Sequence, residues 1–239
     1  MENKANLLLI GSSYNNRNGY FNHCKKEIKN FLGEFKKDEY LVSVPYALPA
    51  ENWGGYTKVA HRFFGASGYK IISVHESDNV HELILGAKAI VVNEAHTNLL
   101  MYSLREKGIF DDIRTLVKAG ELMYLGNPEI VSATIRISNS MPIFALKEFG
   151  ALNVVPFYFK SHFLSAKEHM GQIQREEIKL FIKEHKAPVI GIPESCVVTK
   201  QGDLYVLDGN TYATIFREGG HNSEWEVGQA LTQERIFSF

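Results

Sequence analysis

The residues Gly126-Asn127-Pro128 follow an apolar run, Leu122-Met123-Tyr124-Leu125, which is typical of a buried strand. The carboxyl end of a central strand is where ligands and catalytic groups lie in open α/β sheets. A sharp glycine-containing turn from such a strand into a helix is the setting of a nucleophile elbow, which needs serine or cysteine at its tip. This turn offers Asn127, Pro128 and Glu129 instead. The pattern predicts a site of this kind without its expected nucleophile.

His162 and Glu194 form a second group of residues with chemical potential. His162 lies just beyond an expected strand, and Glu194 follows the apolar run 189–192 after Pro193. A carboxylate at the end of a strand suits the orienting partner of a histidine base. An isolated loop histidine is more often a surface residue, and a carboxylate at this place can also cap the following turn. Each residue alone therefore leaves both interpretations open.

The segment Asn93-Glu94-Ala95-His96-Thr97 follows another apolar run. A loop that stabilises an oxyanion presents backbone N–H groups, and small residues suit it. These residues keep their N–H groups but lack the conformational freedom of glycine. One histidine beside one carboxylate is too little for a metal site, and no HExxH, GxGxxG or Walker pattern occurs in the chain. The sequence predicts no metal and no cofactor.

The composition of the chain argues against a nucleic-acid-binding, membrane or secreted protein. The formal net charge of −1 gives no electrostatic footprint for nucleic acid or an anionic membrane. Cys24 and Cys196 lie far apart without metal-ligand spacing and read as reduced thiols. The apolar part of the N-terminal segment is too short for a signal peptide or a membrane span. We expect a soluble, cytoplasmic protein that forms one domain over residues 1–239.

The elements that must position these residues alternate in type along the chain. Strands are expected at 6–10, 40–44, 69–74, 87–92 and 122–125, with helices at 20–35, from about 53 to 64, and at 81–86, 99–106 and 111–118. After residue 142 we expect a strand at 153–159, a helix at 174–185, short strands at 189–192, 196–199, 204–207 and 214–216, and a hairpin turn at 201–203. Such alternation predicts an α/β fold: a mainly parallel sheet with helices on both faces and a small antiparallel C-terminal part.

Taken together, these segments resemble peptidase E, the α-aspartyl dipeptidase family of serine peptidases. The resemblance runs nearly end to end and implies a flavodoxin-like, class I glutamine-amidotransferase-like fold. It rests on Trp53 and Tyr56, His75, the helix from Leu100 through Arg105-Glu106-Lys107-Gly108, Thr134-Ile135-Arg136 with Asn139-Ser140-Met141-Pro142-Ile143, His162-Phe163, Gly191-Ile192-Pro193-Glu194 and Asp208-Gly209-Asn210-Thr211.

The resemblance implies roles for His162 and Glu194. The catalytic histidine of the family falls on His162, and its acidic triad partner falls on Glu194. The serine of the family lies in a G-x-S-A-G-x-N elbow, where this chain has Gly126-Asn127-Pro128-Glu129-Ile130 and is about two residues shorter. Asn127 therefore marks a degenerate elbow.

Two further sites of the family also differ in this chain. The Gly-Gly-Gly-Asn oxyanion loop is similar in place to Asn93-Glu94-Ala95-His96, with only the following Thr97 preserved. The arginine that reads the aspartyl carboxylate of the substrate aligns with Gln174, and Arg175 is its neighbour, about 100° away around a helix. The resemblance thus implies that Asn93, Glu94, Gln174 and Arg175 line the ligand site.

Changes at the nucleophile, the oxyanion loop and the substrate-reading position together favour a peptidase-E-like protein without ordinary serine-peptidase activity. Such a protein would keep a crevice for a small acidic peptide or an amino-acid-like ligand, or for a partner, as a monomer or homodimer. One alternative is an active hydrolase of aspartyl peptides with a relocated nucleophile, for which Ser132, Ser138 and Cys196 are the candidates. Another is water activation by His162 and Glu194.

Overall fold

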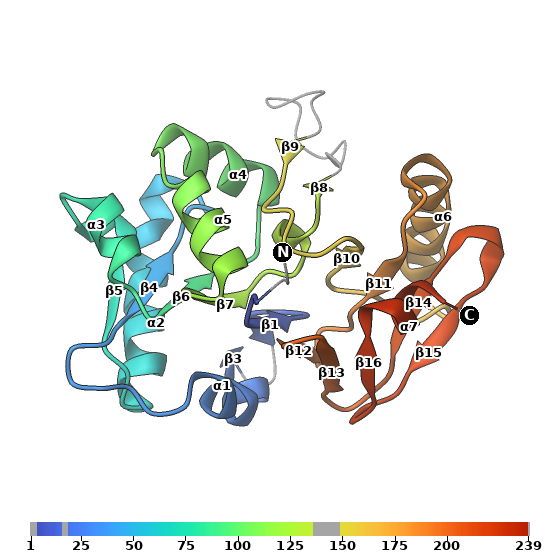
Figure 1. Cartoon of the computed structure of the whole chain (residues 1–239), viewed down its shortest axis with the longest axis horizontal. Coiled ribbons are helices and arrows are strands. Elements are labelled where there is room, and N and C mark those ends of the chain that lie inside the picture. Colours follow the sequence, from blue (N-terminus) through green and yellow to red (C-terminus); the bar gives the residue numbers. More distant parts are fainter. Residues whose placement is uncertain (1–3, 16–18, 136–148, 239) are drawn as a thin grey trace.

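Strands and helices alternate through the first half of the chain in a computed structural model of the protein (Figure 1). The structure describes residues 4–15, 19–135 and 149–238. The elements of the first half are β1 (Leu7–Ile10), β2 (Tyr14–Asn15), β3 (Gly19–Tyr20), η1 (Asn22–Cys24), α1 (Lys25–Leu32), β4 (Leu41–Val44), η2 (Ala50–Asn52), α2 (Trp53–Ala66), β5 (Ile71–Ser73), η3 (Val74–Glu76), α3 (Val80–Leu85), β6 (Ala89–Val92), α4 (Thr97–Glu106), α5 (Phe110–Ala119), β7 (Met123–Gly126) and η4 (Glu129–Val131).

The second half of the chain is built from shorter strands. Its elements are β8 (Thr134–Ile135), β9 (Phe149–Gly150), β10 (Tyr158–Lys160), α6 (His169–His185), β11 (Val189–Gly191), β12 (Val197–Gln201), β13 (Leu204–Asp208), β14 (Ala213–Phe216), η6 (Glu218–Gly220), β15 (Ser223–Trp225), β16 (Ala230–Thr232) and α7 (Gln233–Phe237).

The main sheet has eight strands in the order β16-β13-β12-β1-β7-β6-β4-β5. Strands β1, β7, β6, β4 and β5 run parallel, whereas β12, β13 and β16 are antiparallel to their neighbours. A second sheet, in the order β10-β11-β14-β15, joins one parallel pair to two antiparallel strands. The predicted α/β class with a mostly parallel sheet is confirmed.

Successive residues of β1 face opposite sides of the main sheet, because side chains alternate along a strand. Leu7 and Leu9 belong to a core that includes buried side chains of α3, α4 and α5, whereas Leu8 and Ile10 belong to a core with α1 and α2. Burial on both faces explains why the parallel strands read as unbroken apolar runs. The prediction of helices on both faces is also confirmed.

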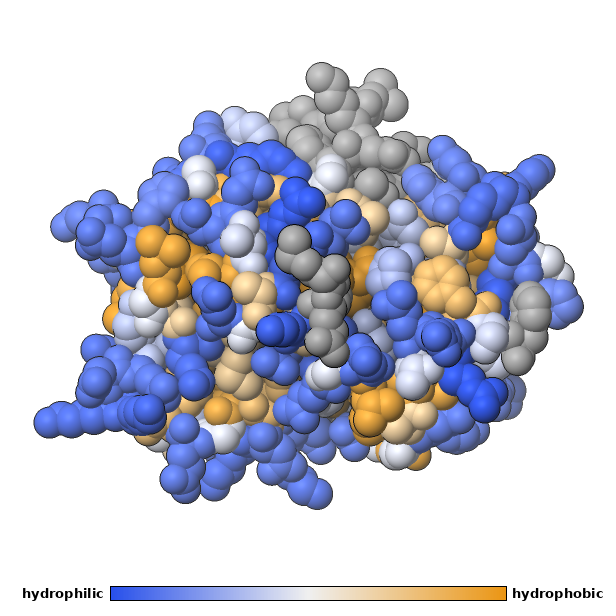
Figure 2. Space-filling model, viewed as in Figure 1, coloured by the Kyte–Doolittle hydropathy of each residue, from blue (hydrophilic) through white to orange (hydrophobic). Residues whose placement is uncertain are grey.

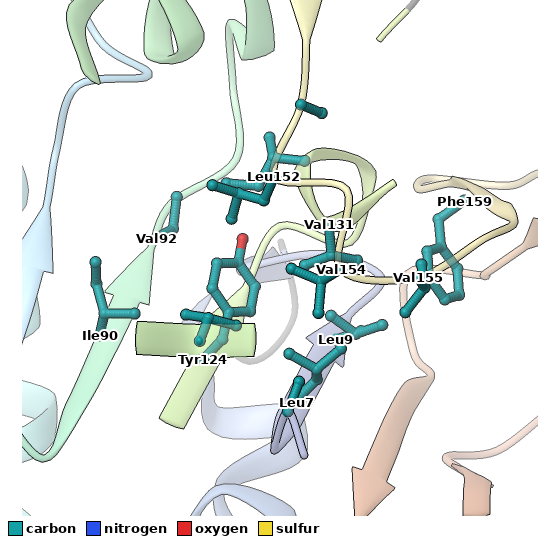
Figure 3. Close-up of a cluster of buried hydrophobic side chains, with 14 of the residues drawn as sticks. Leu7, Leu9, Ile90, Val92, Tyr124, Val131, Leu152, Val154, Val155 and Phe159 are labelled. Atoms are coloured by element: carbon teal, nitrogen blue, oxygen red, sulfur yellow. The ribbon is translucent and has the colours of Figure 1, made fainter. Parts of the chain in front are cut away.

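The prediction of a strand over residues 153–159 is wrong for most of that range. Only β10, at Tyr158–Lys160, is a strand there, because Pro156 cannot donate to a ladder and Asn153 has a positive φ of 50°. The preceding residues bind the turn after β7 instead: Leu152 N–H donates to Ile130 O at 2.8 Å, and Val154 N–H to Val131 O at 2.7 Å. Figure 3 shows Leu152, Val154 and Val131 packed beside β1 and β7.

Two helix boundaries also differ from those expected. The helix expected at 20–35 is only α1, because residues 19–24 form a short strand and a 3₁₀ turn first. Helix α6 begins at His169 rather than at Gln174, because the apolar spacing near its start is weak although the backbone is helical. The single-domain assignment stays a prediction.

The surface seen in Figure 2 is mostly hydrophilic, with hydrophobic residues scattered in small groups. Within the ranges that the structure describes, no helix combines the length and apolarity that a bilayer crossing requires.

Gly126, the last residue of β7, gives a test of this architecture. Its φ is +126°, and a Cβ there would lie 2.0 Å from Val92 O on the neighbouring strand. We expect Gly126→Ala to lower the free energy of unfolding by about 3 kcal/mol or more, measured by urea denaturation.

Gly55→Ala is the matched control, because Gly55 lies within α2 with no heavy atom within 4 Å of the added Cβ. That change should raise stability by about 0.5–1 kcal/mol. A Gly126→Ala variant as stable as the wild type would contradict the close approach of β6 and β7.

Candidate functional site

Loops from five strands meet at one edge of the two sheets. Ser13 follows β1, Glu94 follows β6, Asn127 follows β7, His162 follows β10 and Glu194 follows β11. Strands β1, β6 and β7 are parallel neighbours, as are β10 and β11, so the carboxyl ends within each group are adjacent. The backbone N–H of His162 donates to Gly11 O at 3.2 Å and thereby joins the two groups.

The imidazole of His162 lies between two carboxylates. Its Nδ1 is 2.8 Å from Oε1 of Glu194, and its Nε2 is 3.4 Å from Oε2 of Glu94. The side chain of Glu94 is only 11% exposed, whereas that of Glu194 is 49% exposed. The Nδ1 contact is the one that orients a histidine base, whereas the Nε2 contact lies where such a base would receive the proton of a nucleophile.

The two carboxylates raise the pKa of His162 to about 9. The interaction with Glu94 is the largest cause and Glu194 adds to it, whereas partial burial of the ring acts in the opposite direction. The imidazole is therefore protonated at pH 7, with N–H groups on both nitrogens facing carboxylate oxygens. A protonated histidine cannot accept the proton of a nucleophile.

The backbone of His162 adopts the left-handed conformation, with a φ of +49°. This conformation costs an L-residue roughly 1–2 kcal/mol, so neighbouring contacts must hold it. One such contact is the hydrogen bond to Gly11 O, and another is Gln174 Nε2, which donates to His162 O at 3.0 Å. Gly11 itself must be glycine, because a Cβ there would lie 2.0 Å from Pro193 O.

Gln174 and Arg175, expected at the ligand site, contact the loop that carries His162. Gln174 Oε1 accepts a hydrogen bond from Leu164 N–H at 2.9 Å. Arg175 donates to Leu164 O at 2.8 Å, and its guanidinium lies 4.4 Å from the ring centre of Phe163. Both side chains therefore position this loop, and the ligand-binding role expected for them stays a prediction.

Asn127 lies at the expected elbow position but has its side chain turned into the protein, where it is 2% exposed. Its Oδ1 accepts from Glu129 N–H at 2.8 Å, and its Nδ2 donates to Thr97 Oγ1 at 3.4 Å. The positive φ of this turn belongs to Gly126 rather than to Asn127. The turn is an Asx turn leading into a three-residue 3₁₀ helix.

Asn93 and Glu94, the two residues of the loop after β6 that were expected to bind a ligand, lie in different surroundings. Asn93 is 2% exposed, and its side-chain oxygen has no hydrogen-bond partner among the described residues. Glu94 extends to His162, and its Oε1 also accepts a hydrogen bond from the backbone N–H of Ser13. The carboxylate of Glu94 faces the histidine, and the ligand-binding roles expected for Asn93 and Glu94 stay predictions.

Sequence reasoning missed Ser13 and named Glu129 only as part of the turn after the apolar run. Ser13 supplies its N–H to Glu94, and Glu129 accepts from Ser161 Oγ at 2.8 Å and Ser161 N–H at 3.2 Å. Lys160 Nζ is 3.9 Å from the same oxygen of Glu129. The only available signal was the position of Ser13 and Glu129 just beyond strand ends, because a backbone donor leaves no trace in residue type.

The candidates for a relocated nucleophile do not contact His162 where they are described. Ser132 is 1% exposed, and its hydroxyl has no hydrogen-bond partner in the described ranges. Cys196 is fully buried, its Sγ lies 3.1 Å from Thr211 O, and burial raises its thiol pKa. Ser138 lies outside the described residues, as does Arg136–Ile143 of the motif that carries the resemblance.

Over residues 4–15, 19–135 and 149–238, no group of three or more histidine, cysteine, aspartate or glutamate side chains could hold a metal ion.

Comparison with known proteins connects this arrangement to one family. The model of peptidase family S51 matches residues 7–207. Peptidase E of Nostoc sp. is 31% identical over 225 residues, covering 92% of each chain. The probable alpha-aspartyl dipeptidase of Drosophila melanogaster is 29% identical over 230 residues, covering 94% of this chain and 95% of that protein.

A solved structure supports the fold. The crystal structure of a peptidase from an acI-B1 Actinobacterium superposes with a TM-score of 0.71, covering 97% of this chain and 98% of that chain. The two sequences are 15% identical, so this likeness concerns the arrangement of strands and helices alone.

The pKa of His162 predicts how stability depends on pH. The folded protein holds this proton up to about pH 9, whereas an unfolded histidine releases it near pH 6.5. The stabilisation is therefore fully present below pH 6.5 and is lost as pH rises through 9. We expect the free energy of unfolding, measured by urea denaturation at a series of pH values, to fall across this interval.

His162→Gln should abolish that fall, whereas His81→Gln, at an exposed histidine, should keep it. Burial lowers the pKa of His23, so its contribution to stability rises with pH and cannot produce the fall. A stability that is constant from pH 6.5 to 9 in the wild type would contradict the double ion pair.

Proposed function

Because the chain belongs to peptidase family S51, we propose that it is a peptidase-E-like protein that has lost ordinary serine-peptidase catalysis. Its remaining role would be to bind a small acidic, amino-acid-like ligand or a partner at the strand ends that carry His162 and Glu194. The oligomeric state, expected to be a monomer or homodimer, stays a prediction.

The observation that carries this proposal is the environment of the His162 imidazole. Both ring nitrogens face carboxylates, at 2.8 Å from Glu194 and 3.4 Å from Glu94. Among the described residues neither nitrogen has a hydroxyl or thiol partner. Serine-peptidase catalysis needs a neutral histidine that accepts a proton from a hydroxyl at Nε2, and here a carboxylate takes that place.

The turn after β7 supports the same proposal. Asn127 cannot act as a serine would, and its amide is committed to Glu129 N–H and Thr97. Loss of a triad nucleophile removes most of the rate enhancement, on the order of several kcal/mol of barrier.

The charge of His162 supports an acidic ligand. A protonated imidazole donates charge-assisted hydrogen bonds to carboxylates, which are shorter and stronger than neutral ones. A ligand carboxylate would have to compete with Glu94 and Glu194 for these donors.

The test is hydrolysis of Asp-X dipeptides and of an aspartyl anilide by the purified protein. We expect no turnover above that of His162→Ala, because the base is protonated and its Nε2 is engaged. His81→Ala is the control for a histidine change away from the site. Turnover that is present in the wild type and in His81→Ala but absent in His162→Ala would overturn the proposal.

One observation favours a second candidate function. His162 remains 46% exposed and keeps the 2.8 Å contact with Glu194, an arrangement able to activate water directly. Such a hydrolase would become faster as pH rises through about 9, because the imidazole must first lose its proton. A rate that reaches its plateau below pH 8 would contradict water activation by His162.

A further inference from the structure

The carboxylate of Glu94 is held by donors from two other segments of the chain. The backbone N–H of Ser13, in the loop after β1, donates to Oε1, and His162 Nε2, in the loop after β10, lies 3.4 Å from Oε2. Oε1 therefore accepts a hydrogen bond from Ser13, whereas Oε2 forms an ion pair with the imidazole and no hydrogen bond among the described residues. A backbone N–H and an imidazole that face the two oxygens of one carboxylate are the elements of an anion-binding site.

The surroundings of Glu94 leave it dependent on this pair of donors. The negative charge of Glu94 also acts to raise the pKa values of five other groups: Tyr20, His23, Cys24, Tyr56 and Tyr124. In the part of the chain that the structure describes, no lysine or arginine forms an ion pair with it. A carboxylate enclosed to this degree needs compensation, and the imidazolium of His162, which also faces Glu194, supplies it.

We infer that Ser13 N–H and the imidazole of His162 form a carboxylate-binding site that Glu94 of the same chain fills. The inference rests on the proposed function in that it concerns the same site. It adds the chemical class of the ligand, a carboxylate, and names Glu94 as the group that blocks the site. Both donors would meet any carboxylate equally well, whether attached to the chain or free.

Glu94 competes better for the site than a dissolved acid does, because it is covalently part of the chain. It belongs to the short loop between β6 and α4, so its effective concentration at the site exceeds that of a dissolved acid. A free carboxylate, such as a small acid or the C-terminus of a peptide, therefore occupies the site only when Glu94 leaves it. The loop after β6 acts as a built-in competitor for acidic ligands.

The experiment is an NMR titration of the imidazole of His162 in wild type and Glu94→Ala, with sodium acetate as the probe and sodium chloride at equal ionic strength as the reference. Nine histidines are present, so the His162 signal is assigned by its absence in His162→Ala. In Glu94→Ala the pKa should fall by about 1–3 units, because one of two opposite charges is lost.

Acetate at millimolar concentration should then recover most of that fall in Glu94→Ala and shift the amide signal of Ser13. The wild type should respond to acetate no more than to chloride, because its site is filled.

Glu94→Gln is the matched control, because glutamine removes the charge but keeps the site filled. Its pKa should fall as in Glu94→Ala, and acetate should not restore it. An unchanged His162 pKa in Glu94→Gln would overturn the inference even if Glu94→Ala fails to fold.

An acetate response that is equal in wild type and Glu94→Ala, or absent from a folded Glu94→Ala, would overturn it as well. These readouts are independent of hydrolysis, so they distinguish failure of this inference from failure of the proposed function.

Discussion

The contact between Glu94 and His162 is the constraint on which the rest of the site depends. An enclosed carboxylate is stable only with a partner, and an imidazole between two carboxylates is stable only when protonated. The surrounding contacts keep the two groups in register: Gly11 and Gln174 hold the left-handed backbone of His162, and Ser13 holds the far oxygen of Glu94. Groups from the loops after β1, β6 and β10 and from helix α6 thus hold one ion pair in place.

This arrangement gives a physical reason for the chain to keep His162, whatever its catalytic role. Removing one member of an enclosed ion pair leaves the other uncompensated and is strongly destabilising. His162 neutralises Glu94 as well as meeting Glu194, so its loss would affect folding whether or not any substrate is turned over. A histidine can in this way serve as a structural cation.

Most of the fold follows from the sequence, because apolar runs and helical spacing record burial directly. Strands β1, β4, β6 and β7 lie close to their expected places, and the helices cover both faces. The segment 153–157 was misjudged because an apolar stretch can pack on a turn as well as pair in a sheet. His162, Glu194, Asn127 and Glu94 were singled out because they follow strand ends. The contact of Glu94 with His162 could not be predicted, because it depends on side-chain direction and on a backbone donor at Ser13.

The place of β1 at the centre of the main sheet has a consequence for synthesis of the chain. Its parallel neighbour is β7, but its other edge pairs with β12, where Leu9 lies opposite Val198. Because β12 lies far downstream in the sequence, β1 keeps one edge unpaired until β12 has been made. An uncovered edge of apolar residues is a template for pairing with other chains. During synthesis, β12 thus protects an edge of β1 that would otherwise stay open to other chains.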